Sequence, residues 1–137
     1  MHNTTLRIVN AVILDDQQRV LVVRKHGTSV FIQPGGKREP GESSLVTLAR
    51  ELDEELGLPL LPETARHIGV FETEAANEPG HRVQGESWQL PLQGFPQVHA
   101  EIAELAWIPL QPPHGVPLAA LSEKYILPAL RAQLGIG

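Results

Sequence analysis

Three glutamates in the first half of the chain have the spacing best suited to chemistry. They are Glu51, Glu54 and Glu55, and they lie in a stretch, 44–56, where apolar residues recur at helical intervals. At about 100° per residue, a helix over this stretch projects the three carboxylates within an arc of roughly 100°. A second, apolar stripe lies beside that arc: Leu45, Leu48, Ala49, Leu52 and Leu56. Packing the apolar stripe on a sheet would bring the acids to the sheet's rim, near a groove.

Carboxylates this close repel one another, and their pKa values rise unless positive charge lies among them. A hard divalent cation would supply that charge. Mg²⁺ prefers oxygen ligands and typically takes a few carboxylates together with substrate phosphates, so a diphosphate ligand follows readily. The competing interpretation is that the run RELDEEL over 50–56 is a solvated helix face, which is the common role of a short acidic run.

The spacing around the acids favours the first interpretation. Gly36 is followed after five residues by Glu42, and after seven more by RELDEELGL over 50–58. This stretch resembles the signature of the Nudix hydrolases, G-x5-E-x7-R-E-U-x-E-E-x-G-U with U aliphatic, and it matches every defined position. Such a match would arise by chance at roughly one starting position in a billion. We therefore expect a Nudix hydrolase.

The resemblance implies a set of metal ligands. In the family the helix acids hold one or more Mg²⁺ or Mn²⁺ ions, which here implies Glu51, Glu54 and Glu55 as ligands. The family also uses a backbone carbonyl of the glycine pair before the helix, so Gly35 or Gly36 is expected to add an oxygen ligand. Glycine permits such a close approach because it has no Cβ.

The resemblance also implies supporting residues and a distal acid. Arg50 matches the arginine that braces the acids, and at i,i+4 it can pair with Glu54. Glu42 matches an early glutamate with a supporting role, although a water-mediated metal contact or a plain exposed charge after a Pro-Gly turn are alternatives. Family members commonly carry a further glutamate shortly before a strand with a Trp, as metal ligand or general base. Glu101 is the first candidate for this acid and Glu104 the second; an ordinary surface acid is the alternative for both.

The reaction that the resemblance implies is attack by water on a phosphorus of a nucleoside diphosphate linked to another moiety, X. The metal would lower the pKa of bound water and stabilise charge on the leaving group, and a glutamate base would remove the proton. We expect a nucleoside triphosphate or modified nucleotide as substrate. ADP-ribose and nucleotide sugars are alternatives, as is a non-catalytic nucleotide sensor. The complete set of acids favours an enzyme, since binding-only relatives commonly lose one or more of them.

Candidate substrate contacts lie outside the signature. Arg24 and Lys25 follow the second predicted strand and could meet phosphates, although basic residues at strand ends are more often solvated. The amide of Gln33, just before the glycine pair, could read the edge of a base. Three further polar residues of a predicted loop could touch substrate or simply face solvent: Asn77, Glu78 and His81.

The remaining pattern predicts an α/β fold with a mixed sheet, and the resemblance implies a Nudix-type α/β/α sandwich. Apolar runs at 6–14 and 20–23, separated by polar residues, predict a hairpin. A short run at 30–32 ends at Pro34-Gly35-Gly36, which predicts a tight loop. The helix at 44–56 can be capped by Ser43 or Ser44 and stopped by Gly57. Further strands are expected near 67–72, 83–92 and 104–108.

The chain is expected to close with a helix at about 122–134. Pro128 lies inside this range, so the helix is predicted to be kinked there or to start late.

Composition limits the other possibilities. With 137 residues and 15.0 kDa, the chain is expected to form a single domain over 1–137. The net charge of −5 disfavours binding to nucleic acid polymers or to anionic membranes. There is no cysteine, which fits a cytoplasmic protein, and no apolar run reaches the roughly 18 residues of a membrane span. We expect a small-molecule nucleotide as partner, with the chain as monomer or homodimer.

Overall fold

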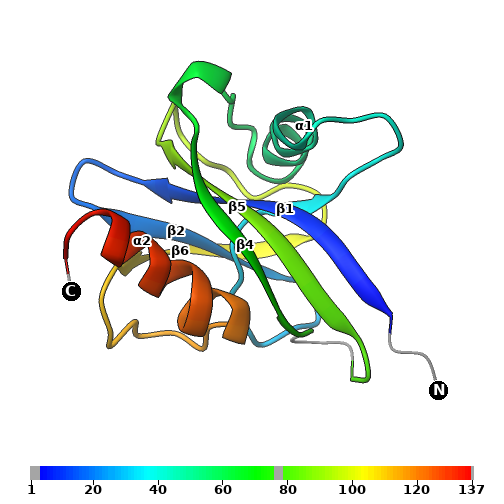
Figure 1. The fold of residues 1–137 in the computed structure, drawn as a ribbon. Helices are drawn as coiled ribbons and strands as arrows, with labels where there is room; N and C mark the ends of the chain where they lie inside the picture. Colours follow the sequence, from blue (N-terminus) through cyan, green and yellow to red (C-terminus); the bar gives the residue numbers. More distant parts are fainter. Residues whose placement is uncertain (1–3, 76–78, 137) are drawn as a thin grey trace.

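The computed structural model describes residues 4–75 and 79–136, and these form one mixed sheet with two helical segments (Figure 1). The strands run in the spatial order β4-β5-β1-β2-β6, and β3 pairs with β1. Strands β1 and β5 are parallel, while the other pairs are antiparallel. The elements in chain order are β1 (Thr5–Leu14), β2 (Arg19–Lys25), β3 (Gly35–Lys37), α1 (Ser44–Leu56), the 3-10 turn η1 (Pro62–Thr64), β4 (Arg66–Glu74), β5 (Arg82–Pro91), β6 (Ile102–Pro109), the π-helix η2 (Leu121–Ile126) and α2 (Leu127–Gln133).

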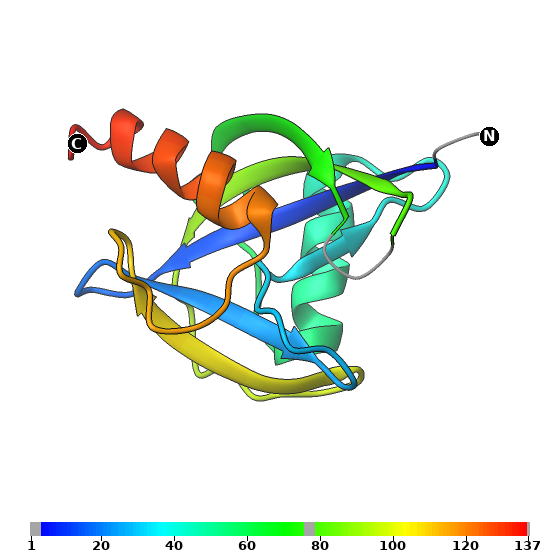
Figure 2. The same ribbon diagram turned by 90° about the horizontal axis from the view of Figure 1, so that it is seen from below.

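The sheet is buried on both faces because its central strands alternate between two cores. On β1, Val9 and Ala11 face a core shared with α1, whereas Val12 faces a core shared with η2 and α2. Strand β2 repeats the pattern with Leu21 and Val22. Figures 1 and 2 show α1 and α2 on opposite sides of the sheet. The predicted α/β/α sandwich with a mixed sheet is confirmed.

Helix α1 has the predicted bounds. The hydroxyl of Ser43 accepts a hydrogen bond from the backbone N–H of Val46 at 3.3 Å, and Gly57 ends the helix in the left-handed conformation with φ 65°. These are an N-cap and a C-cap, which satisfy backbone groups that the helix itself leaves unpaired. The apolar stripe packs as expected, since Leu48 and Leu52 are buried in the core beneath the helix. The helix is therefore fixed in rotation, and with it the direction of its acidic edge.

The tight loop predicted at Pro34-Gly35-Gly36 is wrong, because the glycine pair begins the short strand β3. Gly35 and Gly36 pair with Asn10 and Val9 of β1. A Cβ on Gly35, whose φ is 151°, would overlap the carbonyl oxygen of Val9. Glycine at position 35 thus allows a backbone conformation in which β3 pairs with β1, where paired glycines in sequence suggested only a turn.

The other strands match their predicted positions, with ends shifted by one or two residues in most cases. They extend over 66–74, 82–91 and 102–109. The C-terminal helical segment begins at Leu121 as the π-helix η2, and the α-helix proper starts at Leu127. Pro128 is the second residue of α2 and directly follows η2, so it lies where the helix changes from the π type to the α type. The helical segment as a whole therefore does not start late; only its α-helical part starts near Pro128.

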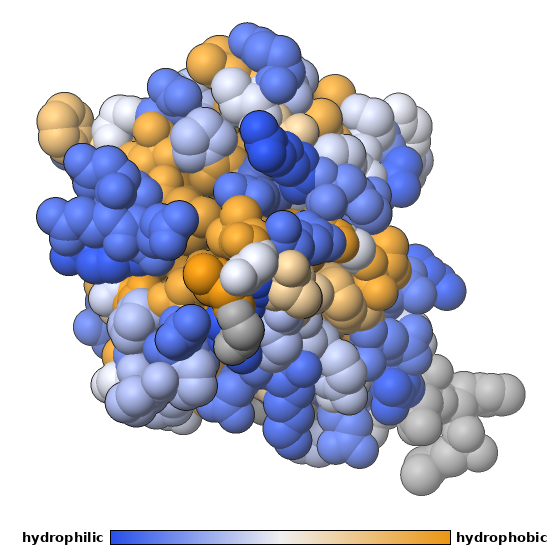
Figure 3. Space-filling model, turned by 60° about the vertical axis from the view of Figure 1, so that its left-hand side comes forward, coloured by the Kyte–Doolittle hydropathy of each residue, from blue (hydrophilic) through white to orange (hydrophobic). Residues whose placement is uncertain are grey.

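Hydrophobic side chains also reach the surface. Figure 3 shows a face on which they gather between hydrophilic residues. Among the large hydrophobic side chains of the described residues, Phe95 is the most exposed, at 91%. The two cores lie inside the sandwich and do not depend on this surface. No helix within 4–75 and 79–136 is long and apolar enough to cross a membrane.

Burial of the apolar stripe predicts the effect of a charge within it. Leu52→Asp would place a carboxylate at a site that is 1% exposed, and we expect a loss of about 3–5 kcal/mol of folding free energy. Urea unfolding followed by circular dichroism measures this loss. Val46→Asp is the matched control on the same helix, because Val46 is 54% exposed. Equal stability of the two variants would show that the helix is oriented differently.

Candidate active site

A pocket of about 510 Å³ opens between the start of β1, β3, α1 and η2. Charged residues from five different segments line it: Lys25, Lys37, Glu51, Glu74 and Glu101. Its other lining residues are largely apolar, with three buried polar residues, Asn10, Gln33 and Ser122, among them. The size lies within the range of small-molecule sites, which are typically concave and mostly apolar with a few placed polar groups.

Two of the three helix acids lie close together beside the glycine pair. Glu55 is only 2% exposed and accepts a hydrogen bond from the backbone N–H of Gly35 at 3.3 Å. Burial, and next the negative charge of Glu51, raise the pKa of Glu55 to about 8. A Cβ on Gly36 would lie 2.5 Å from Oε1 of Glu51, so a larger residue at this position would displace the carboxylate. The sequence pattern thus brings two carboxylates and the glycine backbone to one place.

Glu54 lies apart from that pair. It is exposed on α1, whereas Glu55 is buried and Glu51 is half-buried. Within the part of the chain that the structure describes, no three acidic or histidine side chains are close enough to hold a metal ion as they stand. Ligation by all three helix acids therefore stays a prediction, and it requires Glu54 to turn toward the other two.

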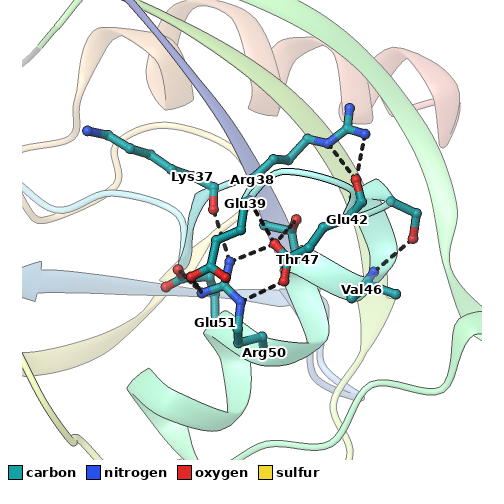
Figure 4. Close-up of polar contacts among 9 residues, drawn as sticks. Lys37, Arg38, Glu39, Glu42, Val46, Thr47, Arg50 and Glu51 are labelled. Carbon is teal, nitrogen blue, oxygen red and sulfur yellow. Dashed lines mark hydrogen bonds and ion pairs between the residues drawn. The ribbon is translucent and has the colours of Figure 1, made fainter.

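Arg50 connects the acids to the loop before the helix (Figure 4). Its guanidinium donates to both carboxylate oxygens of Glu42, at 2.9 and 2.8 Å, and to Oε1 of Glu51 at 2.9 Å. It also donates to the carbonyl of Lys37 at 3.1 Å. The predicted i,i+4 pairing of Arg50 with Glu54 is wrong, because the guanidinium of Arg50 is hydrogen-bonded to Glu42 and Glu51. The bracing of an acid by Arg50 is nevertheless present, at Glu51.

Glu42 is held inside this network. Besides Arg50, it accepts hydrogen bonds from the hydroxyl of Thr47 and the backbone N–H of Glu39, each at 2.8 Å (Figure 4). The hydrogen bonds from Arg50, and next that from Glu39, lower the pKa of Glu42 to about 2. A carboxylate whose oxygens already accept four hydrogen bonds has little capacity left for a cation. The arrangement suits the supporting role predicted for Glu42.

Of the two candidates for the distal acid, Glu101 lines the pocket and Glu104 does not. Glu101 lines it and pairs with Lys25, with Nζ and Oε1 3.4 Å apart. Glu104 lies opposite Arg24 in the β2–β6 pairing, and the two side chains form an ion pair at 2.7 Å. Neither Glu104 nor Arg24 lines the pocket. The structure thus brings Glu101 and Lys25 to the candidate site and leaves the other pair beside it.

The segment before β6 is hydrogen-bonded to the C-terminal end of α1. The backbone N–H groups of Gln97 and His99 donate to the carbonyls of Leu56 and Glu55, at 3.0 and 2.9 Å. These bonds satisfy two C-terminal carbonyls of α1 that would otherwise lack a partner. The carbonyl of Glu101 in turn accepts from the N–H of His26 at 2.9 Å. Glu101 is therefore positioned by backbone contacts to both α1 and the end of β2.

Sequence reasoning found Gln33 but missed Asn10 and Ser122. Asn10 is a polar residue inside the apolar run LRIVNAVIL, and this interruption was the available signal. Ser122 gave none, because its position depends on how η2 packs. Among the loop residues, His81 does not line the pocket. Asn77 and Glu78 lie outside the described residues.

Comparison with known proteins identifies the family. A family model described as NUDIX domain matches residues 4–130, and the chain therefore belongs to the NUDIX domain family. Among curated proteins it is similar to CMP-5'-(N-acetyl-N-hydroxy-3-aminopropyl)phosphonate hydrolase of Streptomyces rubellomurinus, at 31% identity over 108 residues. That match covers 72% of this chain and 49% of the relative, so the chain spans about half the relative's length.

Solved structures share the fold over nearly the whole chain. The solution structure of the E. coli ORF135 protein matches with a TM-score of 0.75 and 27% identity, covering 96% of this chain and 92% of that one. The NUDIX domain of Shewanella oneidensis NrtR, solved as a complex with ADP ribose, matches with a TM-score of 0.75 and 21% identity, covering 97% and 90%. The chain is thus a Nudix domain with the family's hydrolase signature.

The raised pKa of Glu55 predicts a pH dependence of folding. Its folded-state pKa of about 8 exceeds the ordinary value of 4.5, so between these values the folded state retains a proton that the unfolded state has lost. Stability from this group is full below about pH 4.5 and is lost as the pH rises to about 8. In Glu55→Gln the side chain at this position cannot ionise, so its contribution to the folding free energy is not lost as the pH rises. In a chelator, we expect its melting temperature to exceed that of the unmodified protein at about pH 8.5 and to match it near pH 4.5. If the melting temperatures of the variant and the unmodified protein changed with pH in the same way across this range, Glu55 would not be buried in its protonated state.

Proposed function

We propose that the protein is a Mg²⁺-dependent hydrolase that cleaves the diphosphate bond of a nucleoside diphosphate linked to X. A nucleoside triphosphate or modified nucleotide is the proposed substrate. The observation that carries this proposal is the pairing of Glu51 with the buried Glu55 beside Gly36, at the rim of a nucleotide-sized pocket. The chain's membership of a family with hydrolase relatives supports the same reaction class.

The donor set fits a hard divalent cation. Burial, and next the charge of Glu51, raise the pKa of Glu55, so ionisation of Glu55 beside Glu51 is unfavourable unless a cation accompanies it. Carboxylate and carbonyl oxygens are the ligands that Mg²⁺ and Mn²⁺ accept. The proposed ligands are the carboxylates of Glu51, Glu54 and Glu55 and the carbonyl of Gly36, with Glu101 as a further candidate. When bound, the cation would lower the pKa of water and screen the phosphate charges.

The residues of the chain would position the substrate and move the proton. Lys25 and Lys37 line the pocket and would attract the phosphates. The attacking water would give its proton to Glu101, which reaches the pocket from a backbone fixed at both α1 and β2. Arg50 would hold Glu51 in the orientation that a ligand needs, because three of its donors are already fixed by Glu42 and the Lys37 carbonyl.

The relatives support a nucleotide as substrate. The curated relative is named for hydrolysis of a CMP-linked phosphonate, and the NrtR domain was solved with ADP ribose. Both ligands carry a nucleoside joined through phosphorus to a second group. A substrate screen should therefore include nucleoside triphosphates, oxidised and methylated nucleotides, CMP conjugates, nucleotide sugars, ADP-ribose and dinucleoside polyphosphates.

The screen tests the proposal when Glu54→Gln serves as the comparison. This variant removes a proposed ligand from an exposed position, so we expect turnover of the preferred substrate to fall by about 100-fold or more. The melting temperature should change by less than about 3 °C. Release of phosphate or pyrophosphate, measured at saturating Mg²⁺, follows turnover.

Asp53→Asn is the matched control, since Asp53 is an exposed carboxylate on the same helix at an undefined position of the signature. It should retain full activity. Undiminished turnover in Glu54→Gln would remove Glu54 from the ligand set. A nucleotide that binds the unmodified protein without being hydrolysed would replace the proposed enzyme with a nucleotide sensor.

A further inference from the structure

Within 4–75 and 79–136, two residues other than glycine have a positive φ, namely Gln18 at 59° and Ala100 at 54°. This left-handed conformation brings the Cβ of an L-residue too close to a backbone carbonyl, so it costs conformational free energy. Gln18 lies in the turn between β1 and β2, whereas Ala100 directly precedes Glu101 of the candidate site. Such conformations persist only where surrounding contacts impose them, and they cluster at functional sites.

Ala100 is the second residue of a tight turn. The backbone N–H of Ile102 donates to the carbonyl of His99 at 3.1 Å, which closes the turn over 99–102. Ala100 has a positive φ and Glu101, the third residue, does not. Turns of this kind are dominated by glycine, asparagine and aspartate at the left-handed position. The chain thus has an alanine where the backbone favours other residues.

The residue before Ala100 is anchored to the C-terminal end of α1. The backbone N–H of His99 donates to the carbonyl of Glu55 at 2.9 Å. The ring of His99 lies close to the C-cap of the helix, since a Cβ on Gly57 would lie 3.2 Å from its Cε1. One end of the turn is therefore fixed to the helix that carries Glu51 and Glu55.

The residues after Ala100 are anchored to β2 and to the core. The carbonyl of Glu101 accepts a hydrogen bond from the N–H of His26 at 2.9 Å. Ile102, the first residue of β6, is 2% exposed and packs in the core that the sheet shares with α1. Ala100 thus joins two fixed points, and these contacts impose its left-handed conformation.

We propose that Ala100 is a positioning residue, whose left-handed conformation directs the carboxylate of Glu101 into the pocket. This inference rests on the proposed function and deepens it, because it explains how the proposed base is held. Glycine would adopt the same φ without strain, but it would also populate many other conformations. Alanine has few allowed regions, so between two anchors it leaves the next residue one orientation.

Ala100→Gly tests the proposal. Glycine relieves the strain, so we expect the melting temperature to stay within about 3 °C of that of the unmodified protein. We expect kcat to fall by about tenfold, with KM changed less than twofold, because Glu101 loses its fixed orientation. Steady-state kinetics with whichever of ATP, CTP, GTP and UTP is turned over fastest gives both constants. Ala100→Asn should restore kcat, since asparagine keeps a Cβ and tolerates the left-handed region.

Gln18→Gly is the matched control. It makes the same backbone change at the other strained residue, which does not line the pocket, so kcat and KM should both be unchanged. Equal kcat values for Ala100→Gly and the unmodified protein would overturn the proposal. A tenfold fall in kcat in Gln18→Gly would overturn it too, because relief of strain alone would then explain the effect.

A double-mutant cycle shows whether Ala100 acts through Glu101. We expect Glu101→Gln to lower kcat and the further change Ala100→Gly to have no additional effect, since the carboxylate that Ala100 positions is then missing. A merely structural role predicts that Ala100→Gly lowers kcat by the same factor in both backgrounds. That additivity would refute the positioning role.

Hydrogen exchange separates this inference from the proposed function, because it needs neither substrate nor metal. The amides to follow are those of His26 and Ile102, which donate to the carbonyls of Glu101 and His99. We expect both to exchange about tenfold faster in Ala100→Gly and at unchanged rates in Gln18→Gly. Faster exchange in a protein that hydrolyses no nucleotide would support the placement of Glu101 by Ala100 and refute the enzyme. Hydrolysis with unchanged exchange and unchanged kcat in Ala100→Gly would support the enzyme and refute the positioning role. Neither hydrolysis nor a change in exchange would refute both.

Discussion

The site depends on keeping a second carboxyl group beside Glu51 although the surroundings oppose its ionisation. Glu55 is buried on α1 next to Glu51, and burial together with the charge of Glu51 raises its pKa. What fixes the pair is not a charge between them. Instead, the guanidinium of Arg50 donates a hydrogen bond to Glu51, and the backbone N–H of Gly35 donates one to Glu55. The carboxylates therefore remain close in a form that a divalent cation can stabilise further.

This constraint explains several features of the fold at once. Gly36 has no side chain where a Cβ would meet the Glu51 carboxylate. The tight packing of β3 on β1 places that glycine backbone against α1. The two caps of α1 and its buried stripe fix the rotation of the helix, and the segment before β6 is bonded to its C-terminal carbonyls. Each contact restricts where Glu51 and Glu55 can lie, so most of the sandwich on the α1 side serves to position them.

Sequence predicted the parts of this arrangement that follow from local pattern. The bounds of α1, its caps and its buried stripe follow from helical periodicity and from Ser43 and Gly57. The signature spacing identified the family. The glycine pair was misjudged because the residues that make it a strand, Val9 and Asn10, are distant in sequence. The partner of Arg50 was misjudged for the same reason: helical spacing points to Glu54, while the loop that brings in Glu42 is set by tertiary structure. Asn10 of β1 and Ser122 of η2 line one pocket only because of the tertiary structure, which no local pattern encodes.

We propose that α1 holds a divalent cation through Glu51 and Glu55, and direct measurement of cation binding tests this most sharply. Electron paramagnetic resonance measures free Mn²⁺ during a titration of the protein. We expect the unmodified protein to remove Mn²⁺ from solution in a saturable way, Glu51→Gln to weaken this binding strongly, and Asp53→Asn to leave it unchanged. A free Mn²⁺ signal that the unmodified protein does not lower, or binding that Glu51→Gln does not alter, would contradict it.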